Sequence, residues 1–228
     1  MMRVGILTSG GDCQGLNAAI RGVAKALYES FDEIEIYGIS DGYRGLIRGE
    51  YKRMKPEDFS GILTIGGTIL GTSRQPYKLM RVVEEDSVDK VAAMKKTVTK
   101  LRLDCLVIMG GNGTHKTANL LREEGVPVVT LPKTIDNDLW GTDITFGFQS
   151  AVDIAANVID CIHTTATSHG RVFIVELKMC IRDRSTTILT TTARIAAVAA
   201  VNRTRPTNPR RIRKRSNPVL PGPDSGRE

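Results

Sequence analysis

The chain has 228 residues, of which 41% are hydrophobic, 25% charged and 5% aromatic, which is enough for one hydrophobic core of ordinary size. No apolar run approaches the roughly 18 residues that a membrane helix needs, and the N-terminus lacks the apolar stretch of a signal peptide. The four cysteines are scattered without CxxC spacing, which favours reduced thiols over a disulfide framework or a zinc site. These features predict a soluble cytoplasmic protein without a membrane partner.

The net charge of +7 belongs to the C-terminal end of the chain. Residues 178–228 hold 12 of the 32 Lys and Arg residues but only 3 of the 25 Asp and Glu residues, so residues 1–177 are slightly acidic. The end of the chain is dense in Arg and Pro, a composition that buries too little apolar surface to fold. We therefore expect one domain at 1–177 and a non-native or disordered basic tail at 178–228.

The junction between these two parts has an unusual sequence. Lys178 to Arg184 (KMCIRDR) is what one reading frame of the transposon-end adapter used in sequencing libraries encodes. Our hypothesis is that the natural frame ends near Leu177. The alternatives are a genuine basic tail and, as a different class of function, nucleic-acid binding through RRIRKR. Because that basic run coincides with the adapter-like end, we expect no nucleic-acid partner.

In chain order, apolar runs alternate with helical patterns. Strands are predicted at 3–8, 35–39, 61–65, 104–109, 127–131 and 172–175, and helices at 16–30, 88–101, 116–124 and 149–165. The strand runs are rich in Val, Ile and Leu without polar alternation, which is typical of a parallel sheet covered on both faces. The predicted fold class is α/β, a doubly wound, mostly parallel sheet with helices on both faces. Ligands of such sheets bind at the carboxyl ends of the strands.

Two glycine-rich loops follow predicted strands at that edge. Gly10 and Gly11 open the first loop, and Gly110 to Thr114 (GGNGT) form the second, with Thr114 suited to cap the next helix. Glycine allows the backbone to approach an anion, and a following helix N-terminus supplies free N–H groups. Two unrelated tight turns would have the same sequence, but two such loops at one edge favour a phosphate site.

A third motif, PKTIDND, follows the strand at 127–131. In an extended segment, residues two apart face the same way, so Asp136 and Asp138 are predicted to point into one cleft. One carboxylate could act as general base and the other could orient a metal–phosphate, while Lys133 adds a cation for a phosphoryl group. An Asp- and Asn-rich solvent turn is the alternative.

Six segments in this order resemble the N-terminal part of the 6-phosphofructokinases of glycolysis, over residues 3–177. They are LTSGGDCQGLNAAIRG, SDGYRGL, GGTILGTSR, GGNGTHKTA, PKTIDNDLWGTDITFGFQSA and TTATSHGRVFIVE. GGNGT alone would be insufficient, because a related pattern marks NAD and lipid kinases. The resemblance implies ATP-dependent phosphorylation of fructose 6-phosphate, with Mg²⁺, by a homo-oligomer that is a dimer or tetramer.

The resemblance also implies roles for individual residues. Gly11 would hold the nucleotide phosphates, Arg74 would compensate charge on the transferring group, and Tyr43 would pack on adenine. Asp136 would take the proton from the sugar 1-hydroxyl. The remaining implied contacts are Gly111, Asn112, Gly113 and Thr114 to phosphates, Lys133, Thr134 and Asp138 to the reacting groups, and Arg171 to the sugar 6-phosphate from a neighbouring subunit.

Three residues bear on the phosphoryl donor and the metal. Asn112 stands where the family usually has an Asp that contacts Mg²⁺, so metal affinity should fall. Gly113 is the ATP-type residue, because the diphosphate-using branch has Asp there, whereas Lys133 is typical of that branch. We favour ATP because sterics at residue 113 decide whether ATP fits. The alternatives are a diphosphate-dependent phosphotransferase and a noncatalytic nucleotide-binding fragment.

Family members continue into a second domain that supplies much of the sugar site, whereas here residue 177 is followed by the adapter-like segment. We therefore expect the 228-residue chain to have no kinase activity and to fold poorly. Faces that the second domain covers would be exposed.

Overall fold

The structure is a computed structural model that describes residues 1–82 and 88–175; the predicted basic tail and its adapter-like junction lie outside these residues. Five strands form one sheet in the order β3-β2-β1-β4-β5. All neighbouring strands are parallel except β2 and β3. The predicted α/β class with a mostly parallel sheet is confirmed. The strands are β1 (Met2–Thr8), β2 (Ile34–Ile39), β3 (Tyr51–Met54), β4 (Cys105–Gly110) and β5 (Val128–Pro132).

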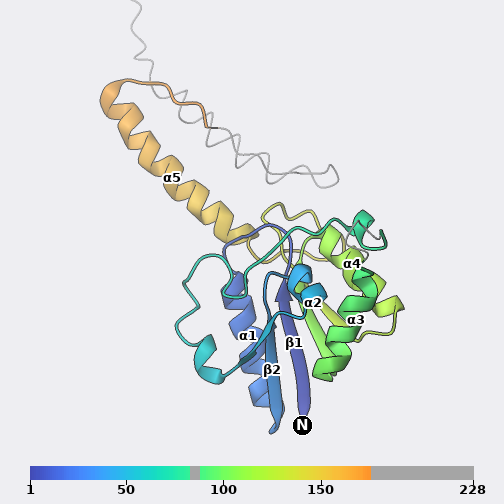
Figure 1. Cartoon of the computed structure of the whole chain (residues 1–228). Helices are drawn as coiled ribbons and strands as arrows, with labels where there is room; N and C mark the ends of the chain where they lie inside the picture. The colour runs from blue at the N-terminus through green and yellow to red at the C-terminus, as the bar shows by residue number, and fades with distance from the viewer. Residues whose placement is uncertain (83–87, 176–228) are drawn as a thin grey trace, which may run out of the picture.

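Helices cover both faces of this sheet (Figure 1). Helix α1 packs on one face, and α3 and α4 pack on the other. Consecutive strand residues alternate between faces, so the neighbours Ile6 and Leu7, each at most 1% exposed, enter different cores. The helices are α1 (Leu16–Ser30), α2 (Tyr43–Arg48), α3 (Lys90–Leu101), α4 (Asn112–Glu123) and α5 (Phe148–His169), with short 3₁₀ turns η1 (Pro56–Phe59) and η2 (Tyr77–Leu79).

The strand order creates a switch point beside β1. The chain passes from β1 to β2 on one side and later returns to β4 on the other side. The loops that leave β1 and β4 therefore diverge at the carboxyl edge, which is where doubly wound sheets have their crevice. Both predicted glycine loops lie at this point.

Two predicted strands are wrong, and two observed elements were not predicted. Residues 61–65 form turns, with Leu63 and Ile65 60% and 52% exposed, and 172–175 is not a strand. Instead, the mainly polar edge segment Tyr51–Met54 pairs with β2 as the antiparallel strand β3, and residues 43–48 form the unpredicted α2. Apolar runs become strands only where a neighbouring strand supplies hydrogen-bond partners, and 61–65 and 172–175 have none among the described residues.

Helix α5 differs from the other helices in its surroundings. Its 22 residues span about 33 Å, and it projects away from the sheet (Figure 1). Only Phe148 and Ala166 of this helix are buried, whereas Ile154 and Val158 are 46% and 51% exposed. Helix α5 therefore has an exposed apolar side, and whether a second domain covers it stays a prediction. Within the described ranges, no helix combines the length and apolarity needed to cross a bilayer.

Candidate functional site

A cavity of about 500 Å³ opens at the carboxyl ends of β1, β4 and β5. Eight of the predicted site residues line it: Gly11, Arg74, Gly111, Gly113, Thr114, Lys133, Thr134 and Asp136. They come from four separate stretches of the chain. The fold therefore brings together both glycine loops, two cationic side chains and one of the two predicted acids.

The first glycine loop is held by main-chain hydrogen bonds to its neighbours. The N–H of Ser9 donates to the carbonyl of Met109 in β4 at 2.9 Å, and the N–H of Gly10 donates to the carbonyl of Ser73 at 3.1 Å. Gly10 has φ 95°, a left-handed conformation that glycine adopts without steric cost. The loop is thus anchored on both sides before any ligand binds.

Arg74 is positioned by the segment that precedes it. The hydroxyl of Thr8 donates to the carbonyl of Gly71 at 2.7 Å, and the hydroxyl of Thr72 donates to the carbonyl of Gly10 at 2.9 Å. These bonds hold the segment along the end of β1. The Arg74 Nη2 atom consequently lies 3.4 Å from where a Cβ would stand on Gly11, so the guanidinium covers the first loop.

The second loop places a helix N-terminus against the cavity. Helix α4 begins at Asn112, and its first main-chain bond runs from the His115 N–H to the Gly111 carbonyl at 3.0 Å. The N–H groups of residues 112–114 precede that bond and have no partner within the helix. Together with the helix dipole they favour an anion at this position.

Thr114 does not cap this helix, contrary to prediction. The helix begins at Asn112, four residues before its predicted start, with Gly111 as its cap. The buried Thr114 hydroxyl instead donates to the carbonyl of Ser9 at 3.4 Å. A Cβ on Gly110 would lie 2.4 Å from the Thr114 Oγ1 atom. The glycine therefore allows Thr114 to pack against β4 and join the two loops.

Lys133 connects the first loop to the end of β5. Its side chain is only 4% exposed, and its ammonium donates to the carbonyl of Gly11. Burial lowers the pKa of Lys133, the nearby positive charge of Arg74 lowers it further, and Cys13 and Asp12 act in the opposite direction. Burial also raises the pKa of the Cys13 thiol, so that group is held in its neutral form.

Asp136 and Asp138 do not point into one cleft. Asp136 lines the cavity, but Asp138 is exposed and outside its lining. The reason is Asn137, whose φ of 50° breaks the extended geometry on which the prediction depended. The Asn137 side chain accepts from the Thr145 N–H at 3.0 Å and donates to the Asp143 carbonyl at 3.2 Å, so it holds this turn.

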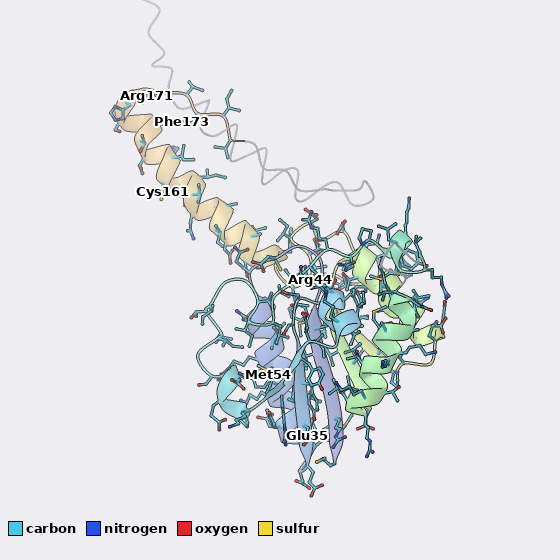
Figure 2. The ribbon with its side chains drawn as sticks, viewed as in Figure 1. Glu35, Arg44, Met54, Cys161, Arg171 and Phe173 are labelled. Carbon is cyan, nitrogen blue, oxygen red and sulfur yellow. The ribbon has the colours of Figure 1, made fainter. Side chains whose placement is uncertain are left out.

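Three other predicted residues also stand apart from the cavity. Tyr43 is 0% exposed, and its hydroxyl donates to the Thr114 carbonyl at 2.8 Å, so neither face of its ring is available to adenine. Asn112 is exposed in the first turn of α4, outside the cavity lining. Arg171 follows the far end of α5, well away from the sheet (Figure 2).

Other residues complete the cavity wall and were not predicted. Asp12 and Tyr77 have side chains suited to ligand binding, and Tyr77 is 43% exposed at the rim. Asp12 stands in the SGGD motif and could have been found there, whereas nothing in the local pattern around Tyr77 marks it. The others are Ser9, Cys13, Gln75, Pro76 and Ile135, while Gly10, which also lines the cavity, belongs to the predicted first loop.

The described residues contain no group of three His, Cys, Asp or Glu side chains that could hold a metal ion. Asp12 and Asp136 are the carboxylates that line the cavity within the described part of the chain. Mg²⁺ is commonly held by one or two carboxylates together with substrate phosphates and water. This donor set therefore fits a metal that arrives with a phosphorylated ligand.

Comparison with known proteins identifies the family. The family model for Phosphofructokinase matches residues 3–212. The chain is 60% identical over 177 residues to an ATP-dependent 6-phosphofructokinase of Spirochaeta thermophila, covering 76% of this chain and 48% of that protein. It is 46% identical over 177 residues to a pyrophosphate–fructose 6-phosphate 1-phosphotransferase of Amycolatopsis methanolica, covering 77% and 49%.

Among solved structures, the phosphofructokinase of Saccharomyces cerevisiae superimposes with a TM-score of 0.69 at 30% identity, covering 79% of this chain and 26% of that one. The chain spans about half the length of the curated relatives it matches. The family match runs to residue 212, whereas these two relatives align over 177 residues, so the boundary near Leu177 stays a prediction. The chain belongs to the phosphofructokinase family.

Proposed function

We propose that this chain carries the phosphoryl-donor half of the active site of an ATP-dependent 6-phosphofructokinase, which converts fructose 6-phosphate to fructose 1,6-bisphosphate. The observation that carries the proposal is the meeting of both glycine loops, Arg74, Lys133 and Asp136 around one cavity. Unpaired N–H groups and cations suit the phosphates, and the carboxylate suits an incoming hydroxyl.

In the proposed reaction, Asp136 accepts the proton of the sugar 1-hydroxyl as that oxygen attacks the γ-phosphorus. The new O–P bond forms while the bond to the β-phosphate oxygen breaks, and ADP leaves. The Asp136 N–H donates to the Thr134 hydroxyl at 3.1 Å, and the Thr145 hydroxyl donates to the Thr134 carbonyl at 2.7 Å. These bonds hold the base in place, and phosphoryl transfer depends mainly on such positioning and on charge stabilisation.

Mg²⁺ would enter this site as a complex with the ATP phosphates, where it neutralises their charge. Asp136 and Asp12 are the carboxylates that would contact it or its waters. Asn112 is not supported in this role, because it stands outside the cavity and carries no charge.

The sugar side of the site is incomplete around this cavity. Arg171 and Asp138, which the family resemblance implies at the substrate, both lie outside its lining. We propose that fructose 6-phosphate is bound by these residues in a homo-oligomer, together with the part of the relatives that this chain does not span. A noncatalytic nucleotide-binding role for the chain by itself is the second candidate, favoured by the same separation.

The choice of ATP over diphosphate rests on the space beside Gly113. A Cβ placed on Gly113 would meet nothing within 4 Å, so this part of the cavity is open for the rest of a nucleotide. Replacing Gly113 by Asp would place a carboxylate there. We expect Gly113→Asp to weaken ATP binding by at least tenfold while diphosphate binding changes less, as measured by titration calorimetry. An equal loss for both donors would contradict the assignment.

A chimera tests the activity itself. Residues 1–177 would replace the matching part of the Spirochaeta thermophila relative, and ADP formation would be followed with and without fructose 6-phosphate. We expect ATP-dependent turnover in the chimera. We expect none in the 228-residue chain, which should still bind ATP. A chimera that folds and binds fructose 6-phosphate but shows no turnover with ATP would overturn the proposal.

A further inference from the structure

Lys133 contacts the first glycine loop, in addition to the phosphate contact predicted for it. It is a nearly buried cation whose ammonium donates to the Gly11 carbonyl, across 122 positions of sequence. An ammonium offers three donors, so a bond to a carbonyl does not exhaust it. The bond joins the end of β5 to the middle of the first glycine loop.

Fixing the Gly11 carbonyl also fixes the next N–H group. The described residues contain no cis peptide bond, and in a trans peptide the C=O of one residue and the N–H of the next point in opposite directions. The Asp12 N–H therefore points away from Lys133. It makes no main-chain hydrogen bond among the described residues, although Asp12 lines the cavity.

The same bond removes an electrostatic obstacle. A carbonyl oxygen carries partial negative charge, and an unpaired one at a phosphate site would repel the ligand. A cation bonded to the Gly11 carbonyl offsets that charge at close range. Burial and the nearby positive charge of Arg74 lower the pKa of Lys133, and the Asp12 carboxylate opposes this lowering.

We propose that Lys133 is a positioning residue that locks the Gly11–Asp12 peptide, so that the Asp12 N–H is presented to a donor phosphate oxygen before the donor binds. The phosphate part of this inference rests on the proposed function. The locking part does not, because it concerns the free protein. This difference allows the two to be tested separately.

The test uses backbone ¹⁵N relaxation on the 228-residue chain without ligand. In the unmodified chain, the N–H vectors of Gly11 and Asp12 should have order parameters near the rigid value of about 0.85, and in Lys133→Met they should fall below about 0.6. Lys116→Met is the matched control, because Lys116 is exposed on α4 and its loss removes the same charge. It should leave both order parameters unchanged.

Donor binding supplies the second measurement. Lys133→Met should weaken ATP and inorganic diphosphate alike by about tenfold, the usual effect of losing a hydrogen bond to a charged group. If affinity falls but the free loop stays rigid, Lys133 is only a direct phosphate ligand and the proposal is overturned. If the unmodified chain binds neither donor, the proposed function fails, while the order parameters still decide the locking role.

Lys133→Met could fail to fold, because it removes a buried polar contact. In that case the order parameters of the unmodified chain test the proposal. Low values for Gly11 and Asp12 in the free protein would overturn it directly. Lys133→Arg adds a further arm, because it keeps a charged N–H donor. We expect it to hold the loop rigid, and a mobile loop in a folded Lys133→Arg protein would also overturn the inference.

Discussion

Residues at the cavity edge of the sheet are held by many contacts within the chain, whereas residues of helix α5 have few. At the cavity, residues from four stretches of the chain are held by bonds such as Gly10 to Ser73, and strands β1 and β4 beneath them are buried on both faces. Helix α5 buries only two of its 22 residues, and Arg171 lies beyond its end. The proposed donor half of the site is therefore built from contacts within this chain, whereas the proposed sugar half needs contacts that the described residues do not supply.

The largest expected effect concerns the proposed base. In the chimera, Asp136→Asn keeps the size of the side chain but cannot accept the proton, so kcat should fall by about 10²- to 10⁴-fold. Asp143→Asn is the matched control, because Asp143 is exposed in the same loop and lies outside the cavity. Steady-state kinetics would measure both variants. A kcat for Asp136→Asn within threefold of the parent would exclude the assigned role.

A matched pair of isoleucines compares the two regions by stability. Ile108 in β4 is 0% exposed and Ile154 in α5 is 46% exposed. Ile108→Ala should lower the free energy of unfolding by about 2–5 kcal/mol, and Ile154→Ala by less than about 0.5 kcal/mol. Urea unfolding followed by circular dichroism measures both. Similar losses of unfolding free energy in the two variants would mean that α5 is packed in solution. The difference in packing between the cavity edge and α5 would then be wrong.

Tyr77 is the next residue to test, as a contact for the base of the proposed nucleotide. It is the aromatic side chain of the cavity wall within the described residues, and it is 43% exposed, while the predicted adenine partner Tyr43 is fully buried. Stacking of a base on an aromatic ring is worth about 1–3 kcal/mol. Tyr77→Leu should therefore weaken ATP roughly tenfold and leave inorganic diphosphate unchanged, by titration calorimetry.

The control for that variant is Tyr51→Leu, which alters a tyrosine of the edge strand β3 outside the cavity. It should change the affinity for neither donor. A uniform loss for ATP and diphosphate in Tyr77→Leu would show that the rim has lost its shape rather than a stacking partner.

The smallest expected effect concerns pH and the opposite end of the sheet. The Tyr37 hydroxyl donates to Glu35 at 3.0 Å and, with Arg53 and Arg3, lowers the pKa of this carboxyl. Because the pKa is lower in the folded state, the stabilisation is complete above the unfolded pKa of Glu and is lost as the pH falls toward the folded value.

Urea midpoints measured between neutral and acidic pH should therefore fall less steeply in Glu35→Gln than in the parent. Glu33→Gln is the control, since its side chain is 76% exposed in a terminal ion pair. Donor binding at the other end of the sheet should not follow this titration. Identical pH profiles for the parent and Glu35→Gln would refute the prediction.

The sequence predicted long regular elements better than short ones. Helix 16–30 and the strand at 104–109 are found within a residue of their predicted positions, because both have long apolar patterns and clear glycine boundaries. The polar edge strand β3 was missed because its pairing with β2, rather than its own residues, makes it a strand. The run 61–65 was wrongly predicted as a strand because its residues are mainly apolar, although no neighbouring strand pairs with it among the described residues.

For the site, motifs located the loops but not every side chain. Gly11, Gly113, Lys133 and Asp136 line the cavity as expected, because strand ends and helix starts determine where they lie. Asp138 was misplaced because the conformation of one residue, Asn137, depends on bonds to residues 143 and 145 that no local rule contains. Tyr77 comes to the rim through tertiary packing alone.

The loop that Asn137 organises also carries Trp140, which is the chain's single tryptophan and is fully exposed. Indole emission shifts to shorter wavelength when the ring leaves water. Trp140 thus gives the protein a built-in fluorophore a few residues from Asp136, and a blue shift on mixing with a candidate partner subunit would report that the loop at 137–145 has been covered.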